Sequence, residues 1–176
     1  MVGAAGGYVA AEYAARGVSF DDRGARLDEY MAAMNALWTM DQPSFHGEYI
    51  TFDEVDAYPR PVSKPTPPVV FGGTSVAAFR RAVTSGHGWY GVGSVQTIKM
   101  SIESLRAAER RHSRPEALGP IEVIVTPVDG CAPDTIRRYE DLGVDAIVAF
   151  PTEPGEPMHD PVPLERLLRK VELLAL

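Results

Sequence analysis

The chain has 176 residues, of which 45% are hydrophobic and 23% charged, so its length and composition predict a globular domain with a buried core rather than a disordered segment. Its formal net charge of −7 argues against a nucleic-acid partner, because binding to a phosphate backbone depends on clustered cations. No apolar run is long enough to span a bilayer, no charged-then-apolar leader is present, and the single Cys131 cannot form an internal disulfide, so we expect a cytoplasmic protein with no membrane partner.

Residues 1–20 are predicted to be a loop, because their glycine-rich start follows no recognisable strand. A helix is predicted over 21–41, where Asp21 and Asp22 can cap the first turn. Its apolar residues fall on one face at helical spacing, and they are Leu27, Tyr30, Met31, Met34, Leu37 and Trp38. We interpret this face as part of the core and not as a cofactor contact.

Residues 44–66 are predicted to form an insertion before the regular part of the chain. The stretch 44–52 alternates aromatic and β-branched residues with others, as a short hairpin does. The stretch 58–68 contains too many prolines for a helix or a central strand, so we expect an extended segment. Because this segment runs directly into an apolar strand, we do not interpret it as a linker between domains.

Residues 67–176 are predicted to form four strand–helix units. The strands are expected at 69–71, 87–92, 121–127 and 146–150. Each is followed by a helix whose apolar residues recur at helical spacing, namely Val76, Phe79 and Val83; Ile98, Ile102 and Leu105; Ile136, Tyr139 and Leu142; and, after Pro163, Leu164, Leu167, Leu168 and Val171. This alternation is typical of βαβ units and a parallel sheet.

The stretch Pro67–Ser75 carries the main functional prediction. Two prolines exclude a helix at its start, and Val69–Phe71 is an unbroken apolar run, which favours a parallel strand covered on both faces. The two glycines that follow allow a ligand to approach the backbone, ahead of a helix whose first N–H groups have no partner within the helix. Such a turn can bind an anion such as a phosphate. The alternative is an ordinary strand-to-helix loop in which Thr74 or Ser75 only caps the helix.

Four strand–helix units fit two architectures. One is an open doubly wound sheet, but a complete phosphate-binding protein of that kind requires a fifth or sixth strand that the pattern does not show. The other is half of a closed (β/α)8 barrel, which needs about 250 residues when complete. The glycine-rich start of the chain favours the half-barrel. The predicted fold class is therefore α/β of the TIM-barrel-like (β/α)8 family, here a truncated half-barrel with four parallel strands in a single domain of residues 1–176.

Several short segments along the chain have a characteristic order and spacing. They are Gly7-Tyr8 with Glu12 and Gly17, Arg23–Tyr30, Leu37-Trp38, Phe45-His46-Gly47, Pro59-Arg60-Pro61, Pro67–Gly73, Gly88-Trp89 and Gly143-Val144-Asp145. Each has low specificity alone, but together they resemble the luciferase-like flavin or deazaflavin oxidoreductases, in particular those that use coenzyme F420. The resemblance covers nearly the whole chain and implies a TIM barrel, of which this chain corresponds to the stretch from the end of the fourth strand to the C-terminus.

The resemblance also implies cofactor-binding residues. The matching positions are Gly72, Gly73, Thr74 and Ser75 at the cofactor phosphate, Arg23 and Gly24 near the same phosphate in some relatives, and Tyr8 and Glu12 in a loop that lines the cofactor pocket. His87 stands where relatives often carry an acidic residue, which makes it a further candidate. Each of these residues also has a structural interpretation, as a helix cap, a solvated helix start or a surface loop.

We therefore expect an oxidoreductase of the luciferase-like class, which includes monooxygenases, that transfers hydride between a deazaflavin or flavin and a small organic substrate. The expected cofactor is F420, with FMN as the alternative, and no catalytic residue is assigned. His46, His112 and His159 have no metal-like spacing with one another or with Cys131, so no metal is expected. The alternative is a non-catalytic truncated half-barrel, or a subunit that needs a partner chain. In either case we expect a homo-oligomer or completion by another chain, because unpaired strand edges favour association.

Overall fold

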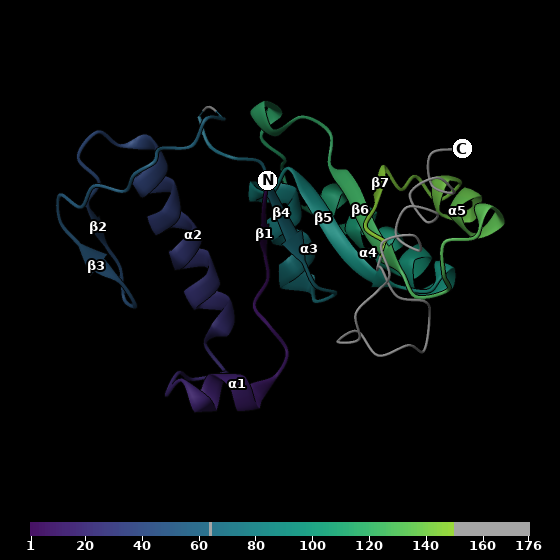
Figure 1. Ribbon diagram of the computed structural model, residues 1–176, viewed down its shortest axis with the longest axis horizontal. Coiled ribbons are helices and arrows are strands. Elements are labelled where there is room, and N and C mark those ends of the chain that lie inside the picture. Colours follow the sequence, from purple (N-terminus) through teal and green to yellow (C-terminus); the bar gives the residue numbers. More distant parts are fainter. Residues whose placement is uncertain (64, 150–176) are drawn as a thin grey trace, which may run out of the picture. The chain divides into compact units, whose positions relative to one another are not determined.

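The computed structural model describes residues 1–63 and 65–149, and its contacts divide the chain into two compact units, Met1–Gly72 and Gly73–Leu176 (Figure 1). The elements in chain order are β1 (Val2–Ala4), α1 (Ala10–Ala15), α2 (Arg23–Thr39), β2 (Phe45–His46), β3 (Thr51–Phe52), β4 (Val69–Gly72), α3 (Val76–Ser85), β5 (Gly88–Gly93), α4 (Val95–Arg111), the 3-10 helix η1 (Glu116–Leu118), β6 (Glu122–Pro127), α5 (Pro133–Glu140) and β7 (Ala146–Ile147). The predicted end of the fourth strand at Phe150 and the helix after Pro163 lie outside the described residues.

The main sheet is parallel and has five strands in the order β1-β4-β5-β6-β7. The four predicted strands are present and follow one another in that order, but the prediction of only four strands is wrong. The fifth strand is β1, whose Val2 lies opposite Val69 and donates its N–H to the carbonyl of Pro68 at 2.7 Å. Three residues are too few to show an alternation of apolar and polar side chains. They form a strand because they pair with β4, which the local sequence does not reveal.

The predicted loop over residues 1–20 is also wrong where it contains β1 and the six-residue helix α1. Helix α1 has the sequence AAEYAA, and alanine has the highest intrinsic helix propensity. The helix ends before Gly17, which has φ +66°, a left-handed conformation that glycine adopts without strain.

Helix α2 forms as predicted, but its start and its apolar face differ from the prediction. Asp22 is the N-cap residue but makes no capping hydrogen bond, because its carboxylate instead binds the Arg26 guanidinium at 2.9 Å. The buried residues of the helix are Ala33 and Ala36, and the large side chains predicted as core are half-buried or, for Tyr30, 40% exposed. The other elements of the first unit in the described part of the chain are short, namely the strands β1 and β4, the helix α1 and the two-stranded hairpin, and the large side chains of α2 stay only half-buried.

Polar side chains hold α2 to its neighbours in the first unit. The predicted hairpin is confirmed, with β2 antiparallel to β3. In the turn between these strands, the N–H groups of Glu48, Tyr49 and Ile50 donate to the Glu29 carboxylate of α2 at 2.7–2.9 Å. Burial by itself raises the pKa of Glu29, but these three hydrogen bonds outweigh it and hold the pKa below its usual value. At the other end of the helix, the Arg60 guanidinium donates to the carbonyls of Leu37 and Met40.

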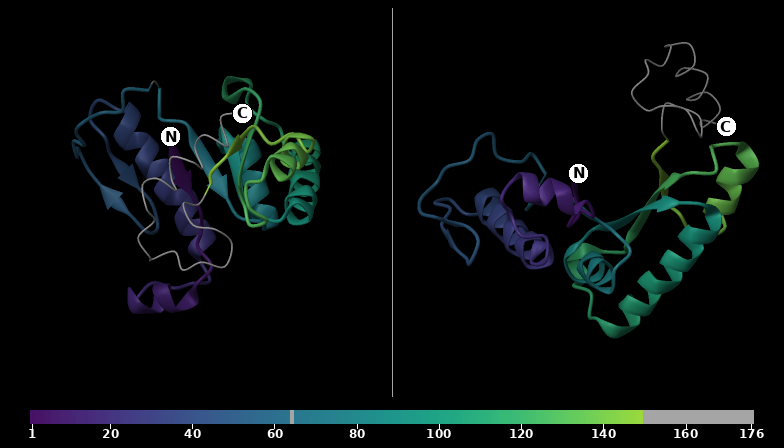
Figure 2. Two further views of the ribbon diagram at one scale, coloured as in Figure 1. Left: turned by 45° about the vertical axis from the view of Figure 1, so that its right-hand side comes forward. Right: turned by 90° about the horizontal axis from the view of Figure 1, so that it is seen from below.

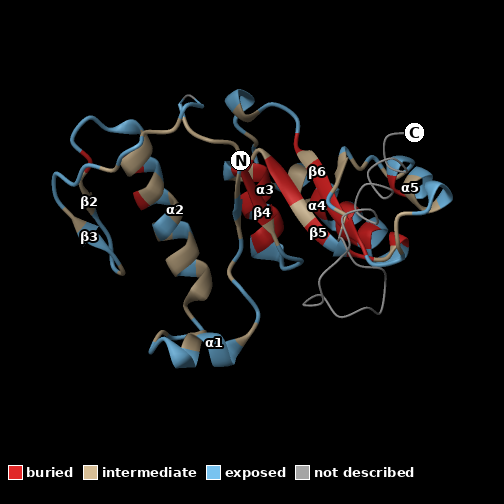
Figure 3. Ribbon diagram, in the orientation of Figure 1, coloured by how far each residue is buried: buried red, intermediate tan, exposed pale blue. Residues whose placement is uncertain are grey.

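The core of the second unit lies between strands β5 and β6 and the helices α3 and α4, which cover the same side of these strands (Figure 2). Buried residues gather in these four elements (Figure 3). Ile98, Ile102 and Leu105, which share the helical spacing of α4, are buried, whereas Val76 is 76% exposed although it shares the spacing of Phe79 and Val83. Val76 is the first residue of α3 and lies at the turn, before the helix reaches its packed part.

The amino end of strands β5 and β6 is closed by hydrogen bonds from side chains. The Arg114 guanidinium donates to the carbonyls of Ala82, Val83 and Gly86 at the end of α3, at 2.9–3.1 Å, and also to carbonyls around η1. The Asp145 carboxylate accepts the N–H of Val123 at 2.7 Å. None of the helices in the described part of the chain is long and apolar enough to cross a membrane.

Candidate functional site

The turn between β4 and α3 has a conformation that only glycine adopts readily. Gly73 has φ +113°, and a Cβ atom built on it would lie 3.3 Å from the Cβ of Ala78. A side chain at this position would therefore be strained and would also fill the space beside the turn. The Gly-Gly prediction is confirmed as a local structure, because only three residues separate the end of the buried strand β4 at Gly72 from the start of helix α3 at Val76.

The start of helix α3 is only partly capped by the chain. Ser75 is the N-cap residue, and its Oγ accepts the N–H of Ala78 at 3.1 Å. The N–H groups of Val76 and Ala77 and the hydroxyl of Thr74 have no hydrogen-bond partner among the described residues. The helix start therefore offers unpaired donors and the positive end of its dipole at the surface.

A buried tryptophan fixes the shape of the turn. The indole Nε1–H of Trp89 donates to the carbonyl of Gly73 at 2.9 Å, and the Trp89 side chain is fully buried. Its ring packs on Phe79 of α3, with ring centroids 5.7 Å apart. Gly91 leaves the space that this ring occupies, because a Cβ atom there would overlap the indole. Strand β5 and helix α3 thus both hold the Gly73 carbonyl in place.

The next helix start, that of α4, is closed by the chain itself. Ser94 caps α4, with its Oγ accepting the N–H of Thr97 at 3.2 Å, and the Asp129 carboxylate accepts the N–H of Val95 at 3.0 Å. This carboxylate occupies the position that an external anion would take at a helix start. Of these two neighbouring helix starts, the one at α3 is therefore the better candidate for an anionic ligand.

Tyr139 supports the closed helix start from α5. Its side chain is fully buried, and its hydroxyl donates to the carbonyl of Gly93 at 2.8 Å. Burial, together with the nearby charge of Asp129, raises the pKa of Tyr139 to about 12, so the hydroxyl keeps its proton throughout the neutral range.

A hollow of about 310 Å³ lies beside the open helix start. It is lined by Thr74, Val76, Phe79, Ser104, Ala107, Ala108, Arg111 and His112. The lining is largely apolar, with two hydroxyl groups and two basic side chains, and it contains no aspartate or glutamate among the described residues. A hollow of this size and composition is within the range of small-molecule sites.

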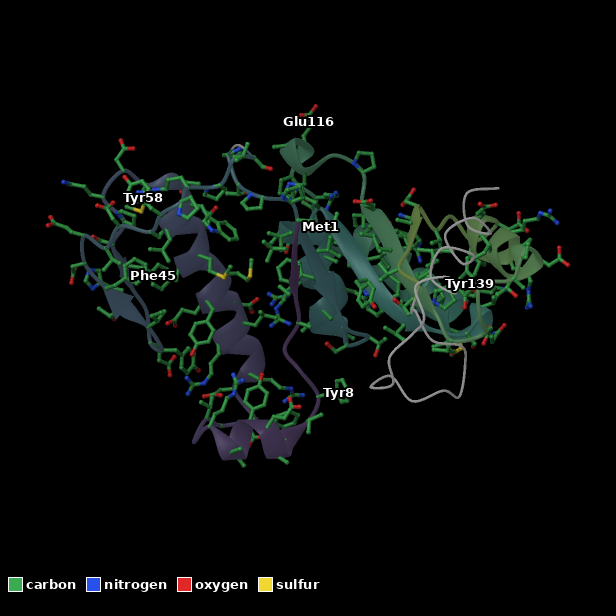
Figure 4. All side chains as sticks on the ribbon, in the orientation of Figure 1. Met1, Tyr8, Phe45, Tyr58, Glu116 and Tyr139 are labelled. Atoms are coloured by element: carbon green, nitrogen blue, oxygen red, sulfur yellow. The ribbon has the colours of Figure 1, made fainter. Side chains whose placement is uncertain are left out.

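The other predicted cofactor residues lie in the first unit. Tyr8 is 90% exposed and projects from the loop after β1 (Figure 4), and Glu12 is exposed on α1. Arg23 begins α2, donates to the carbonyl of Phe20 at 2.8 Å and lies over its ring, and Gly24 follows it in the helix. The structure thus ties Arg23 to its own segment, and whether these residues bind the cofactor stays a prediction.

His87 lies at the amino end of β5, where its carbonyl accepts the N–H of Glu122 at 3.0 Å. Ligands and catalytic groups in parallel α/β folds lie at the carboxyl ends of the strands. The position of His87 therefore favours its structural interpretation over a role at the Gly73 turn.

Sequence reasoning missed three residues that shape the site. Trp89 was noted as part of a Gly-Trp pair, but its hydrogen bond to Gly73 joins residues 16 positions apart and leaves no local pattern. No role was predicted for Asp129 or Arg111 from the sequence. Asp129 lies two residues after the end of β6, and a carboxylate at the carboxyl end of a parallel strand was the signal that could have identified it.

Comparison with known proteins agrees with the resemblance of the segments. A family model described as luciferase-like monooxygenase matches residues 1–152. An uncharacterized protein of Mycobacterium tuberculosis is 32% identical over 165 residues, which are 93% of this chain and 55% of that protein. The FMNH(2)-dependent dimethylsulfone monooxygenase of Pseudomonas putida is 35% identical over 89 residues, 49% of this chain and 24% of that enzyme. The chain thus spans about half the length, 55%, of the first of these relatives.

Two solved structures share the fold. The monooxygenase RslO1 from Streptomyces bottropensis matches with a TM-score of 0.73 at 18% identity, over 99% of this chain and 66% of that one. An F420-dependent secondary alcohol dehydrogenase, solved with an F420-acetone adduct, matches with a TM-score of 0.56 at 17% identity, over 99% of this chain and 60% of that one. At these identities the matches concern the fold alone.

Proposed function

The chain belongs to the luciferase-like monooxygenase family, and from this we propose that it holds the phosphate end of a flavin or deazaflavin in an oxidoreductase. The observation that carries the proposal is the open start of α3, where Val76 and Ala77 have N–H groups without a partner among the described residues. Phosphate oxygens accept such hydrogen bonds, and the helix dipole favours their negative charge.

The residues of the turn fit a phosphate group. Gly73 leaves open the space that a side chain would fill, and the neighbouring Thr74 has a hydroxyl without a hydrogen-bond partner among the described residues. The hydrogen bond from Trp89 holds the carbonyl of Gly73 in place, so the turn does not need to rearrange when an anion binds. The bound flavin or deazaflavin ring supplies the hydride chemistry, and the part of these residues is to bind and orient its phosphate.

For the cofactor we propose F420, with FMN as the alternative. The fold matches a dehydrogenase that is described as F420-dependent, while one partial sequence relative is described as FMNH(2)-dependent. The turn itself recognises a phosphate group, which both cofactors carry, so it does not distinguish them. As the reaction we propose hydride transfer to or from a small organic substrate, or monooxygenation of it.

A second candidate function is that of a subunit that acts only with another chain. The observation that favours it is the apolar surface of the first unit, where Tyr58 is 75% and Val62 is 97% exposed and the large side chains of the α2 face are only half-buried. Exposed apolar surface of this kind marks contact sites. Sedimentation velocity over a range of concentrations tests whether the other chain is a second copy of this one. Self-association supports that form of the candidate, and a monomer at every concentration contradicts it.

The leading proposal is tested by titrating the purified chain with F420 and with FMN side by side, each followed by the change in cofactor fluorescence. Riboflavin, which has the ring of FMN without its phosphate, is the matched control. We expect saturable binding of one of the two phosphorylated cofactors and much weaker binding of riboflavin. Failure of both cofactors to bind, or equal binding of FMN and riboflavin without binding of F420, contradicts the proposal.

A further inference from the structure

The open turn provides hydrogen-bond donors but no cation. Its donors are backbone N–H groups and hydroxyls, all of which are neutral. A phosphate monoester, as in FMN, carries a charge of roughly −1.5 to −2 near neutral pH, and a phosphate diester, as in F420, carries a single negative charge. The partial charge at a helix start, about +0.5, offsets only part of it, so a basic side chain nearby would strengthen the binding of the phosphate.

The hollow beside the turn contains two basic side chains from α4. Arg111 and His112 line the same hollow as Thr74 and Val76. Neither basic side chain has a hydrogen bond or an ion pair with any described residue. By contrast, Arg106, one turn earlier in the same helix, is paired with Glu109 at 2.8 Å.

We infer that Arg111, assisted by His112, neutralises the phosphate that the turn at Gly73 binds. This inference rests on the proposed function, because it concerns the same phosphate. Arginine suits the role, since its guanidinium remains charged at every physiological pH and can donate two parallel hydrogen bonds to phosphate oxygens. No carboxylate lines the hollow within the described part of the chain, so nothing there competes with a phosphate for Arg111.

Another role for Arg111 follows from its place in the last turn of α4. Basic residues at the end of a helix stabilise it by interacting with its carbonyl groups. Arg110 occupies the same last turn and is exposed, but it does not line the hollow. Comparing the two arginines therefore separates a helix-end role, which both can fulfil, from phosphate binding, which only Arg111 can.

The test measures the binding of two pairs of ligands to the wild-type chain, Arg111→Gln, Arg111→Lys and Arg110→Gln. The pairs are FMN with riboflavin, and F420 with its phosphate-free deazaflavin core. The variants are compared in the pair that the wild type binds more tightly. Circular dichroism and thermal melting confirm that each variant is folded.

We expect Arg111→Gln to weaken binding of the phosphorylated ligand about tenfold, while binding of the phosphate-free ligand changes by less than about twofold. Arg111→Lys should recover part of this loss, because it restores the charge but not the fork of donors. Arg110→Gln should leave both affinities within about twofold of the wild type.

Two results overturn the inference alone. One is a wild-type preference for the phosphorylated ligand that Arg111→Gln leaves unchanged. The other is an equal loss in Arg110→Gln and Arg111→Gln. If the wild type shows no preference for the phosphorylated member of either pair, the proposed phosphate site fails, and the role of Arg111 fails with it.

Discussion

The two ends of the parallel strands β4, β5 and β6 are built differently. At the amino end, side chains of the protein pair with exposed main-chain groups. Arg114 donates to the carbonyls at the end of α3, and Asp145 accepts the N–H of Val123 near the start of β6. At the carboxyl end, Asp129 closes one helix start, while Val76 and Ala77 at the other keep N–H groups without a described partner. Paired main-chain groups stabilise the fold, whereas unpaired donors are available to a ligand. The amino end is therefore a stabilising end, and the carboxyl end is a binding end.

The largest expected effect is on the stabilising end, from Arg114→Met. This change removes the donors to three carbonyls at the end of α3 and to those around η1. We expect the free energy of unfolding to fall by about 3 to 4 kcal/mol, and the melting temperature by roughly 10 °C, because several acceptors lose a charged donor together. Differential scanning calorimetry measures the change.

Arg110→Met is the matched control for Arg114→Met, since Arg110 is exposed and belongs to the same stretch of chain. It should change the melting temperature by no more than about 2 °C. The preference for FMN over riboflavin should be the same in both variants. A melting temperature of Arg114→Met within 2 °C of the wild type would show that the amino end is not stabilised in this way.

A smaller loss of stability, accompanied by weaker binding, is expected for Trp89→Phe. Phenylalanine keeps an aromatic ring against Phe79 but removes the N–H group that donates to the Gly73 carbonyl. We expect about 2 kcal/mol of lost stability, or 4–8 °C in melting temperature, and a reduced preference for FMN over riboflavin. Trp38→Phe, at a half-buried position in α2, is the control. An unchanged preference in Trp89→Phe would show that the Trp89 hydrogen bond does not contribute to phosphate binding at the turn.

The smallest effect concerns Tyr139, whose hydroxyl supports the closed helix start. Because burial raises its pKa to about 12, from about 10 in an unfolded chain, its contribution is complete below pH 10 and is lost as the pH rises toward 12. Tyr139→Phe should cost about 1 kcal/mol at pH 7 and should lose less stability than the wild type between pH 10 and 12. Urea unfolding at several pH values measures this, and parallel pH profiles would contradict it.

The regular part of the fold could be predicted because local patterns decide it. The prolines before Val69, the unbroken apolar run and the glycines after it mark one strand and one helix start without any tertiary information. Strand β1 could not be predicted, because three small residues become a strand only by pairing with β4. The exposure of the α2 face could not be predicted either, since periodicity shows which residues share a face but not what covers it.

The candidate site divides in the same way. The glycine turn and the Ser75 cap are local features and were predicted from their residue types. The bond from Trp89, the closure of the neighbouring helix start by Asp129 and the position of Arg111 beside the turn depend on which elements pack together. Sequence alone therefore located the open helix start but did not show that the neighbouring one is closed.

The most direct test of the open turn is the ratio of the FMN and riboflavin dissociation constants, measured for the wild type and for Gly73→Val, together with the ratio for F420 and its phosphate-free core. The wild type should bind the phosphorylated member of one pair at least about tenfold more tightly, since several donors to a charged oxygen contribute. A folded Gly73→Val protein should lose this preference, because its side chain fills the space beside the turn and strains a residue with φ +113°. An undiminished preference in folded Gly73→Val would show that the phosphate binds elsewhere and would contradict the account.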